Sequence, residues 1–147
     1  MRRGSILIAV LLAAALPTSA APAGVWLAES GFAAVGATVG AFVAIAAIAQ
    51  GTPQLESGLA KTAFVIGGLT LGSGTGAAAG TLIAGRLFHW EGNVRACLLG
   101  GLLGGFLSAF TEPILYTLGI PEDITEFFGF LMLPIIPAVG AVIGYNR

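Results

Sequence analysis

Four long apolar segments, separated by short polar turns, make up most of the chain after residue 29. They cover about residues 30–50, 61–88, 93–110 and 121–145. A bilayer takes about 20 apolar residues to cross, and the first two segments reach that length. Backbone groups find no other partners in lipid, so even a segment rich in Gly, Ser and Thr is expected to be helical there. The pattern predicts an all-α fold, a membrane-embedded bundle of three to four glycine-rich helices.

The fourth segment differs from the others because prolines divide it. Pro121, followed by Glu122 and Asp123, makes a favourable helix start, since the acidic side chains face the positive end of the helix dipole. Pro134 and Pro137 then remove two backbone donors from the apolar run. We expect the last helix to be broken there, with a final piece too short to cross a bilayer alone.

The composition favours lipid as the surrounding solvent. Only 9% of residues are charged, against about 25% in an ordinary soluble domain, and 56% are apolar. The mean hydropathy is +0.96. A net charge of −1 gives no basic field for nucleic acid, so we predict no nucleic-acid partner. The bilayer is the expected partner.

The first residues have the three parts of an export signal. Arg2 and Arg3 form the basic end, residues 6–16 the apolar core, and residues 18–21 a small-residue cleavage site. We predict a signal peptide at residues 1–20 and a single helical membrane domain at 21–147. The alternative is an uncleaved first span over residues 5–28. Cys97 is the only cysteine and therefore cannot form an internal disulfide; we expect it to pack between helices.

Glycines and alanines recur every three or four residues in the apolar segments, which places them on one face of each helix. In lipid, helices associate where small residues let their backbones approach closely. A weak G-A-x-x-G repeat also links the first, second and fourth segments. The predicted packing positions are Gly36, Gly40, Gly68, Gly72, Gly76, Gly80, Gly100, Gly101, Gly104, Gly105, Gly140 and Gly144.

These stripes resemble those of the glycine-zipper proteins of bacterial envelopes, and the ending LPIIPAVGAVIGYNR resembles the tail of small exported proteins without an assigned function. The resemblance covers the first, second and fourth segments. It implies a membrane-associated helical module that can be oligomeric, and it implies no particular activity.

Two motifs suggest chemistry, and each has a simpler explanation. Residues 74–79 fit the dinucleotide fingerprint G-x-G-x-x-G/A, but no alternation of strands and helices surrounds them and the four-residue glycine period is not part of that fingerprint. Ser73 and His89 could form a nucleophile–base pair only if they came within about 3 Å. Along one helix they would lie about 24 Å apart. We predict no enzyme activity and no cofactor.

The segment RLFHWEGNVR, residues 86–95, is typical of a loop at the membrane surface. We expect Arg86, His89, Trp90 and Arg95 to lie at the membrane interface, where aromatic and basic residues anchor helix ends. A single histidine beside one carboxylate is too few ligands for a metal site, so none is predicted.

Glu112 is the most informative carboxylate in the sequence. If the third helix continues past Pro113, Glu112 lies inside the bilayer and becomes a candidate ion or proton site, with Arg95 or Lys61 as a possible partner on another helix. If the helix ends at Phe110, Glu112 is a loop residue in water, and this interpretation is favoured because loop placement is far commoner than an intramembrane charge.

The charges conflict with a simple topology. With a cleaved signal and four spans, the acidic loop 112–126 would lie on the cytoplasmic side, and Arg86, Arg95 and Arg147 would lie outside, against the positive-inside rule. The sequence therefore leaves inner and outer membrane open. It predicts a non-enzymatic structural or interaction protein of the bacterial cell envelope, partnered by itself or by another envelope membrane protein. The alternative is a small channel or transporter subunit that uses Glu112 and the broken last helix.

Overall fold

The computed structural model describes residues 22–147, so the predicted signal at residues 1–20 lies outside the described residues. The described chain is all-helical. Its elements are α2 (Ala23–Gly51), the short 3-10 helix η1 (Thr52–Gln54), α3 (Gly58–Leu87), α4 (Val94–Ala109), α5 (Thr111–Thr117) and α6 (Glu122–Tyr145). Four helical stretches are long and apolar enough to cross a membrane: Ala23–Gln54, Gly58–Leu87, Val94–Thr117 and Glu122–Tyr145. The predicted all-α bundle of three to four helices is confirmed.

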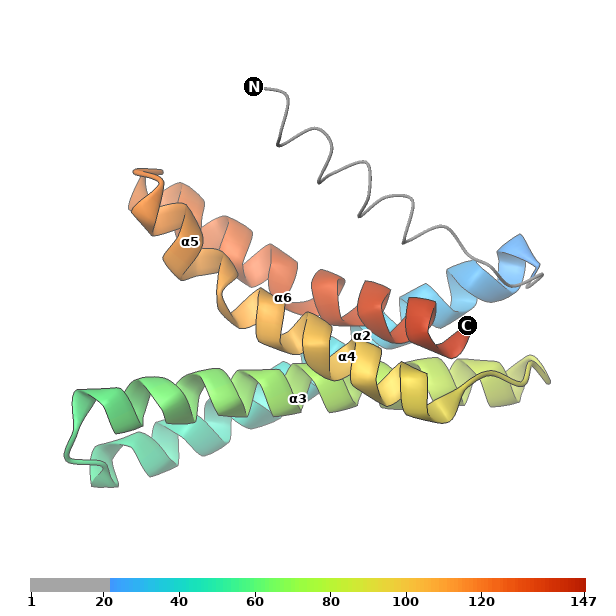
Figure 1. Cartoon of the computed structure of the whole chain (residues 1–147), viewed down its shortest axis with the longest axis horizontal. Coiled ribbons are helices and arrows are strands. Elements are labelled where there is room, and N and C mark those ends of the chain that lie inside the picture. Colours follow the sequence, from blue (N-terminus) through green and yellow to red (C-terminus); the bar gives the residue numbers. More distant parts are fainter. Residues whose placement is uncertain (1–21) are drawn as a thin grey trace.

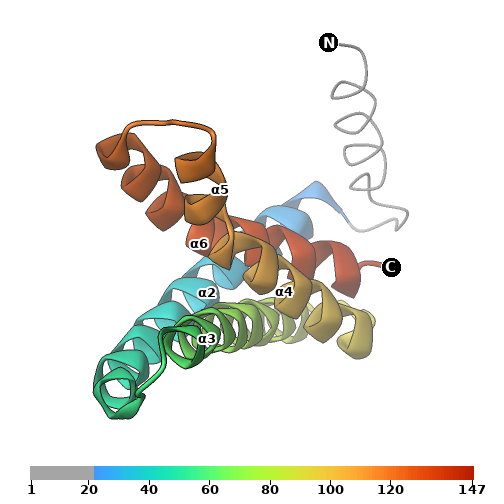
Figure 2. The ribbon, with the colours of Figure 1, turned by 60° about the vertical axis from the view of Figure 1, so that its left-hand side comes forward.

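The helices form two hairpins that cross each other. α2 packs along α3, and α4 packs along α6, while α3 also contacts α4 and α2 also contacts α6. Figures 1 and 2 show the two hairpins together at one end and apart at the other, where α5 and the start of α6 diverge from the α2–α3 turn. We call the first end the Trp90 end: it contains the start of α2, the end of α3, residues 88–93, the start of α4 and the end of α6. The other is the splayed end.

The interior of the bundle is built from small residues. Its buried hydrophobic side chains are mostly alanines, among them Ala37, Ala77 and Ala141, whereas leucines, valines and phenylalanines lie on the outside. Soluble proteins rarely expose so much contiguous apolar surface. Small residues inside and large apolar residues outside are the arrangement expected of helices that pack in lipid.

α2 begins seven residues before the predicted start at residue 30. Pro22 stands directly before the helix, and the chain then continues helically through Glu29 and Ser30. The Ser30 hydroxyl donates to the Trp26 carbonyl within the same helix, so it does not act as a cap. Glu29, predicted to flank the first segment, therefore lies inside a helix.

α6 is one continuous helix through Pro134 and Pro137, which corrects the predicted break. Each proline removes only its own N–H from the helix ladder. The helix after the prolines is held from outside, because Gly140 and Gly144 contact α4 directly. Apolar surroundings add to this, since helical hydrogen bonds are the only ones open to the remaining backbone groups.

The predicted end of the third segment is correct for α4, but the chain does not become a loop there. α5 begins at Thr111, one residue after the C-cap Phe110. Pro113 lies in the first turn of α5, where a missing N–H breaks no helical hydrogen bond. Glu112 is therefore part of a short helix.

Candidate functional site

The largest fully buried side chain of the described residues is a carboxylate, that of Glu29, which has 0% exposure. α2 places it at the Trp90 end of the bundle. Its Oε2 accepts a hydrogen bond from Asn146 Nδ2, and its Oε1 is buried without a hydrogen-bond partner. Sequence reasoning missed this residue, although it interrupts an apolar run that begins at Ala23 and reaches Ile48.

Asn146 joins three parts of the fold through one side chain. It is the C-cap residue of α6, and its Nδ2 donates both to Glu29 and, at 3.0 Å, to the Val142 carbonyl. Its Oδ1 accepts from Trp90 Nε1 at 3.1 Å. The amide therefore links α2, α6 and the α3–α4 connection.

Tyr145 fixes that connection from the other side. Its hydroxyl donates to the Trp90 carbonyl at 2.7 Å, and the Asn93 N–H donates to the Tyr145 carbonyl at 2.8 Å. Within the connection, His89 adopts φ 54°, and the Trp90 N–H donates to the Gly85 carbonyl at 2.8 Å. We call Glu29, Trp90, Tyr145 and Asn146 the polar cluster.

Burying an ionised carboxylate costs free energy. After relaxation, removing an ion from water still costs several kcal/mol unless hydrogen bonds and an opposite charge compensate. Asn146 compensates one oxygen of Glu29 and leaves the other without a partner. Ionisable residues at such positions in membrane helices are functional-site candidates by default, because packing alone would favour an apolar side chain. The polar cluster is thus the strongest candidate site in the described chain.

Two surface pockets adjoin the polar cluster. One of about 510 Å³ is lined by Arg86, His89, Trp90, Glu91 and Tyr145, together with Leu82, Gly85, Gly92 and Val94. The other, of about 390 Å³, is lined by Trp90, Glu91, Gly92, Asn93, Tyr145, Asn146 and Arg147. Asn146 lines the second pocket, is only 4% exposed and contacts Glu29 through its amide.

The four predicted interface residues all belong to the Trp90 end. Arg86 lies in the last turn of α3, His89 and Trp90 in the connection, and Arg95 in the first turn of α4. Arg86 and His89 are exposed and share the larger pocket with the half-buried Trp90. Arg95 is exposed and does not line that pocket.

The predicted packing glycines lie at contacts between helices. A methyl group at Gly36 would overlap the Gly76 carbonyl, one at Gly40 the Gly72 carbonyl, and one at Gly80 the Phe32 carbonyl. Only a residue without Cβ permits α2 and α3 to approach this closely. Gly68 differs, because a Cβ there would meet the flexible side chain of Ile48 rather than backbone.

In α4 the four glycines divide between two neighbours. Gly100 and Gly104 contact the backbone of α6, at Gly140 and Ile136, while Gly101 and Gly105 contact α3, at Gly74 and Thr70. Gly144 meets the Ala96 carbonyl. Cys97 is buried between the same helices, and its thiol lies 3.8 Å from the Ala78 carbonyl that accepts from it.

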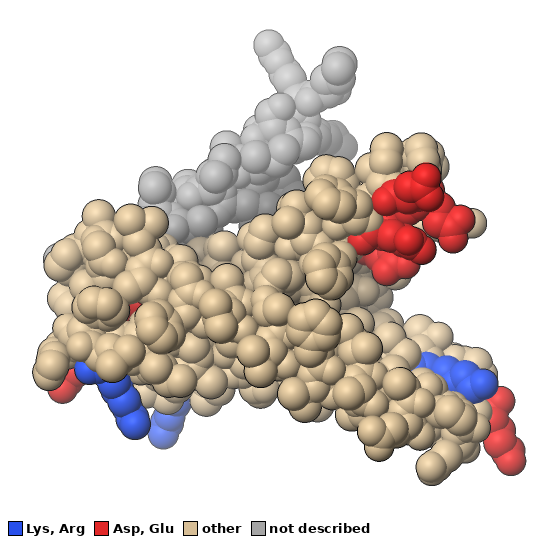
Figure 3. All heavy atoms as spheres, turned by 180° about the vertical axis from the view of Figure 1, so that it is seen from behind, with Lys and Arg blue, Asp and Glu red and all other residues tan. Residues whose placement is uncertain are grey.

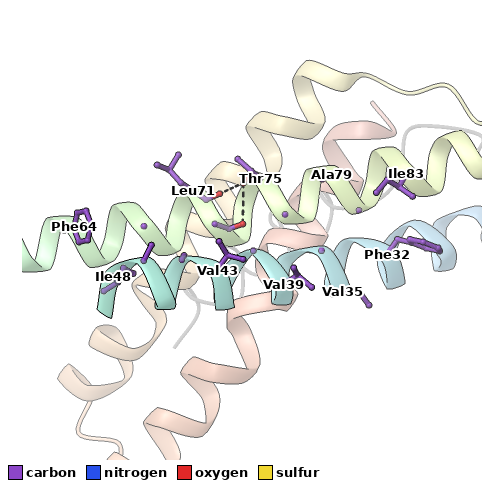
Figure 4. A pocket seen from close by; sticks show the side chains of 18 residues that line it. Phe32, Val35, Val39, Val43, Ile48, Phe64, Leu71, Thr75, Ala79 and Ile83 are labelled. Carbon is purple, nitrogen blue, oxygen red and sulfur yellow. Dashed lines mark hydrogen bonds between the residues drawn. The ribbon is translucent and has the colours of Figure 1, made fainter. Parts of the chain in front are cut away.

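An apolar groove runs along the outer side of the α2–α3 contact (Figure 4). It measures about 850 Å³ and is lined chiefly by valines, glycines and other apolar residues from Phe32 to Ile48 and from Phe64 to Ile83. The Thr75 hydroxyl in its wall donates to the Leu71 carbonyl of its own helix at 2.5 Å. Residues 74–79, the dinucleotide-like motif, lie in the middle of α3, with no preceding strand in the described chain.

The structure does not bring the other candidate residues together. Glu112 is exposed in the first turn of α5 and lies against Gly129 of α6, whereas Arg95 lies in the first turn of α4 at the opposite end of the bundle. Ser73 is buried and donates to the Leu69 carbonyl at 2.6 Å, and His89 is exposed beyond the end of the same helix. Neither pair has a geometry for joint chemistry.

Over residues 22–147, no group of three or more His, Cys, Asp and Glu side chains is placed to hold a metal ion. Comparison with family models, curated proteins and solved structures finds no match for this chain.

Proposed function

We propose that this chain is a non-enzymatic, membrane-embedded structural or interaction protein of the bacterial cell envelope. The observation that carries the proposal is the inverted distribution of side-chain size, with alanine and glycine contacts inside and large apolar side chains such as Leu103, Phe127 and Val43 outside. Such a surface is suited to lipid and to other membrane helices. The resemblance to glycine-zipper envelope proteins supports the same role.

Self-association is part of this proposal, and the fold narrows the surfaces that could serve it. Most helix glycines are already occupied by contacts within the chain. Gly31 and Gly67 face open space, and the α2–α3 groove remains uncovered. A second copy, or another envelope membrane protein, would dock on these remaining faces.

Fluorescence energy transfer between labelled copies in liposomes tests the association. We expect a signal that persists on lipid dilution and falls in Gly31→Leu, or co-purification of one envelope membrane protein with the chain. A polypeptide without its leader that stays dissolved and monodisperse in the absence of detergent would contradict the membrane assignment itself.

The transport alternative loses one of its two features, because α6 is continuous through its prolines. Its other feature, Glu112, is exposed within the candidate span Val94–Thr117 at the splayed end. Ion flux in proteoliposomes distinguishes the two functions. We expect no flux of H⁺, Na⁺ or K⁺; a flux abolished by Glu112→Gln would instead support transport.

The orientation in the membrane can be tested separately. Arg86, Arg95 and Arg147 all belong to the Trp90 end, whereas Lys61 and the acidic residues of α5 and α6 belong to the splayed end (Figure 3). With a cleaved signal, the end of the bundle that contains these three arginines would face outward, against the positive-inside rule. Single cysteines at Ser57 and Glu91 in a Cys97→Ala background, probed with an impermeant thiol reagent in intact cells, would establish which end faces out.

A further inference from the structure

The hydrogen bonds around Glu29 leave its Oε1 without a donor. The polar groups nearest in the network are committed elsewhere: the Tyr145 hydroxyl to the Trp90 carbonyl, the Trp90 indole to Asn146, and the Cys97 thiol to the Ala78 carbonyl. One turn earlier in α2, Trp26 Nε1 is also buried without a partner. An indole N–H could satisfy an oxygen, but it would not neutralise its charge.

Within residues 22–147, two ionisable groups interact with Glu29, and neither supplies a positive charge. Cys97 of α4 and Tyr145 of α6 both interact electrostatically with it, and each is either neutral or negative. The remaining partner, Asn146, is neutral. Among the described residues, none of the groups that interact electrostatically with Glu29 carries a positive charge.

One surface pocket and the buried carboxylate share the Asn146 side chain. The pocket of about 390 Å³ at the Trp90 end is lined by Asn146 and by the exposed side chains of Glu91 and Arg147, which carry opposite charges. The Asn146 Nδ2 also donates to Glu29 Oε2. The pocket is therefore the nearest described opening through which a small cation could reach Glu29.

We propose that Glu29 is the binding site of one small monovalent cation, a proton or an alkali ion, which reaches it through the pocket above Asn146. The Asn146 amide holds Oε2 and so directs Oε1 toward the bound cation. This site does not depend on the proposed structural function, because a cation can bind from one end without crossing the bundle.

Infrared spectroscopy of the full chain in lipid bicelles tests whether the cation bound at Glu29 is a proton. In choline chloride buffer at neutral pH, free of Na⁺ and K⁺, a bound proton gives the C=O stretching band of one protonated carboxyl group per chain. We expect this band to be lost in Glu29→Gln and retained in Glu112→Gln, which removes an exposed carboxyl. If Glu29→Gln fails to fold, Glu29→Asp serves instead, because it keeps the carboxyl group and should shift the band.

Thermal unfolding tests whether the bound cation is an alkali ion rather than a proton. A site that holds Na⁺ or K⁺ shows no such band in choline buffer, and the unfolding temperature of the chain rises when NaCl or KCl replaces choline chloride. That rise should be lost in Glu29→Asp and kept in Glu112→Gln. An ionised Glu29 in choline buffer, with no stabilisation by either alkali ion, would overturn the proposal.

The route is tested by a matched pair of substitutions. Glu91→Trp fills the pocket above Asn146, whereas Arg95→Trp adds the same side chain to an exposed position outside it. The exchange of the bound cation, followed as deuterium replacement of the carboxyl proton or as the rate of the alkali-ion effect, should slow in Glu91→Trp alone. Equal rates in both variants would show that the cation enters elsewhere.

Discussion

The two ends of the bundle are held in different ways. At the Trp90 end, side chains join residues far apart in the sequence: Asn146 bonds Glu29 117 positions away, and Tyr145 bonds the Trp90 carbonyl 55 positions away. At the splayed end the side-chain hydrogen bonds are local, such as Ser57 to the Ala60 N–H and Thr117 to the Ile114 carbonyl. Directional long-range bonds therefore accompany the end at which all four long helices meet.

The difference between the two ends indicates that close glycine packing does not by itself determine how the two hairpins cross. Contacts between smooth helix faces bring backbones together, but they are van der Waals contacts along a ridge and distinguish poorly between neighbouring crossing arrangements. A buried polar cluster has far fewer satisfactory arrangements, because each donor and acceptor must find its partner. We infer that the polar cluster sets the arrangement of the two hairpins, and that the splayed end follows from it.

The largest effect should come from adding volume where backbones touch near the Trp90 end. Gly80→Leu would force a side chain into the Phe32 carbonyl, and backbone cannot move aside as a flexible side chain can. We expect a loss of about 3 kcal/mol or more in the free energy of unfolding. Titration with a denaturing detergent, followed by circular dichroism, would measure it.

The matched control is Gly67→Leu, in the half of α3 nearer the splayed end. A Cβ at Gly67 meets nothing within 4 Å. Because leucine favours helix over glycine, this variant should be unchanged or more stable by up to about 1 kcal/mol. Equal losses in the two variants would mean that the α2–α3 contact does not distinguish the ends.

The next largest effect should follow removal of the central amide. Asn146→Leu removes the hydrogen bond that Glu29 Oε2 accepts within the described chain and the acceptor of Trp90 Nε1, which leaves buried polar groups unsatisfied. The expected cost is about 2–3 kcal/mol in the free energy of unfolding. Chemical denaturation in the same detergent would measure it.

A second substitution separates the lost hydrogen bond from the effect of leaving the buried carboxyl group without a partner. In the double variant Glu29→Leu/Asn146→Leu, no buried carboxylate remains without its partner, so much of the stability should return. If the loss of stability in the double variant equals the sum of the losses in Glu29→Leu and Asn146→Leu, the two residues do not act as a unit.

Much of the fold can be predicted from the sequence because it depends on local features of the chain. Apolar length and small-residue spacing are sufficient to predict four helical segments, and α4 begins and ends within one residue of its predicted limits. The failures have other physical sources. Pro134 and Pro137 predict a break from propensities in water, whereas the continuous α6 reflects apolar surroundings and contacts with α4.

The polar cluster is beyond such local reasoning. Glu29, Ser30 and Gly31 have the composition of a turn, and the partner that permits burial of Glu29 stands at the other end of the chain. The available signal was the apolar run on both sides of Glu29, which makes it an ionisable residue within a span. Asn146 gave no comparable signal, since a polar residue after the last helix is ordinary.

A smaller effect should result from loss of one neutral hydrogen bond. Tyr145→Phe keeps the buried ring and removes the hydroxyl that donates to the Trp90 carbonyl. We expect a loss of about 1 kcal/mol in the free energy of unfolding. Tyr116→Phe is the control: Tyr116 of α5 is 67% exposed and should change stability by less than about 0.5 kcal/mol. A larger loss at Tyr116 would reverse the proposed contrast between the ends.

The smallest effect belongs to the acidic tip of the splayed end. Asp123 lies in the first turn of α6, where a negative charge interacts favourably with the helix dipole. Asp123→Asn should therefore cost about 0.3–1 kcal/mol at low ionic strength, and the cost should shrink as salt is added. Glu56→Gln, just before α3, removes a charge outside the described helices and should have little effect. Thermal unfolding at two salt concentrations would distinguish them. A salt-independent loss in Asp123→Asn would mean that its side chain makes a specific contact, and that the splayed end is held by more than local interactions.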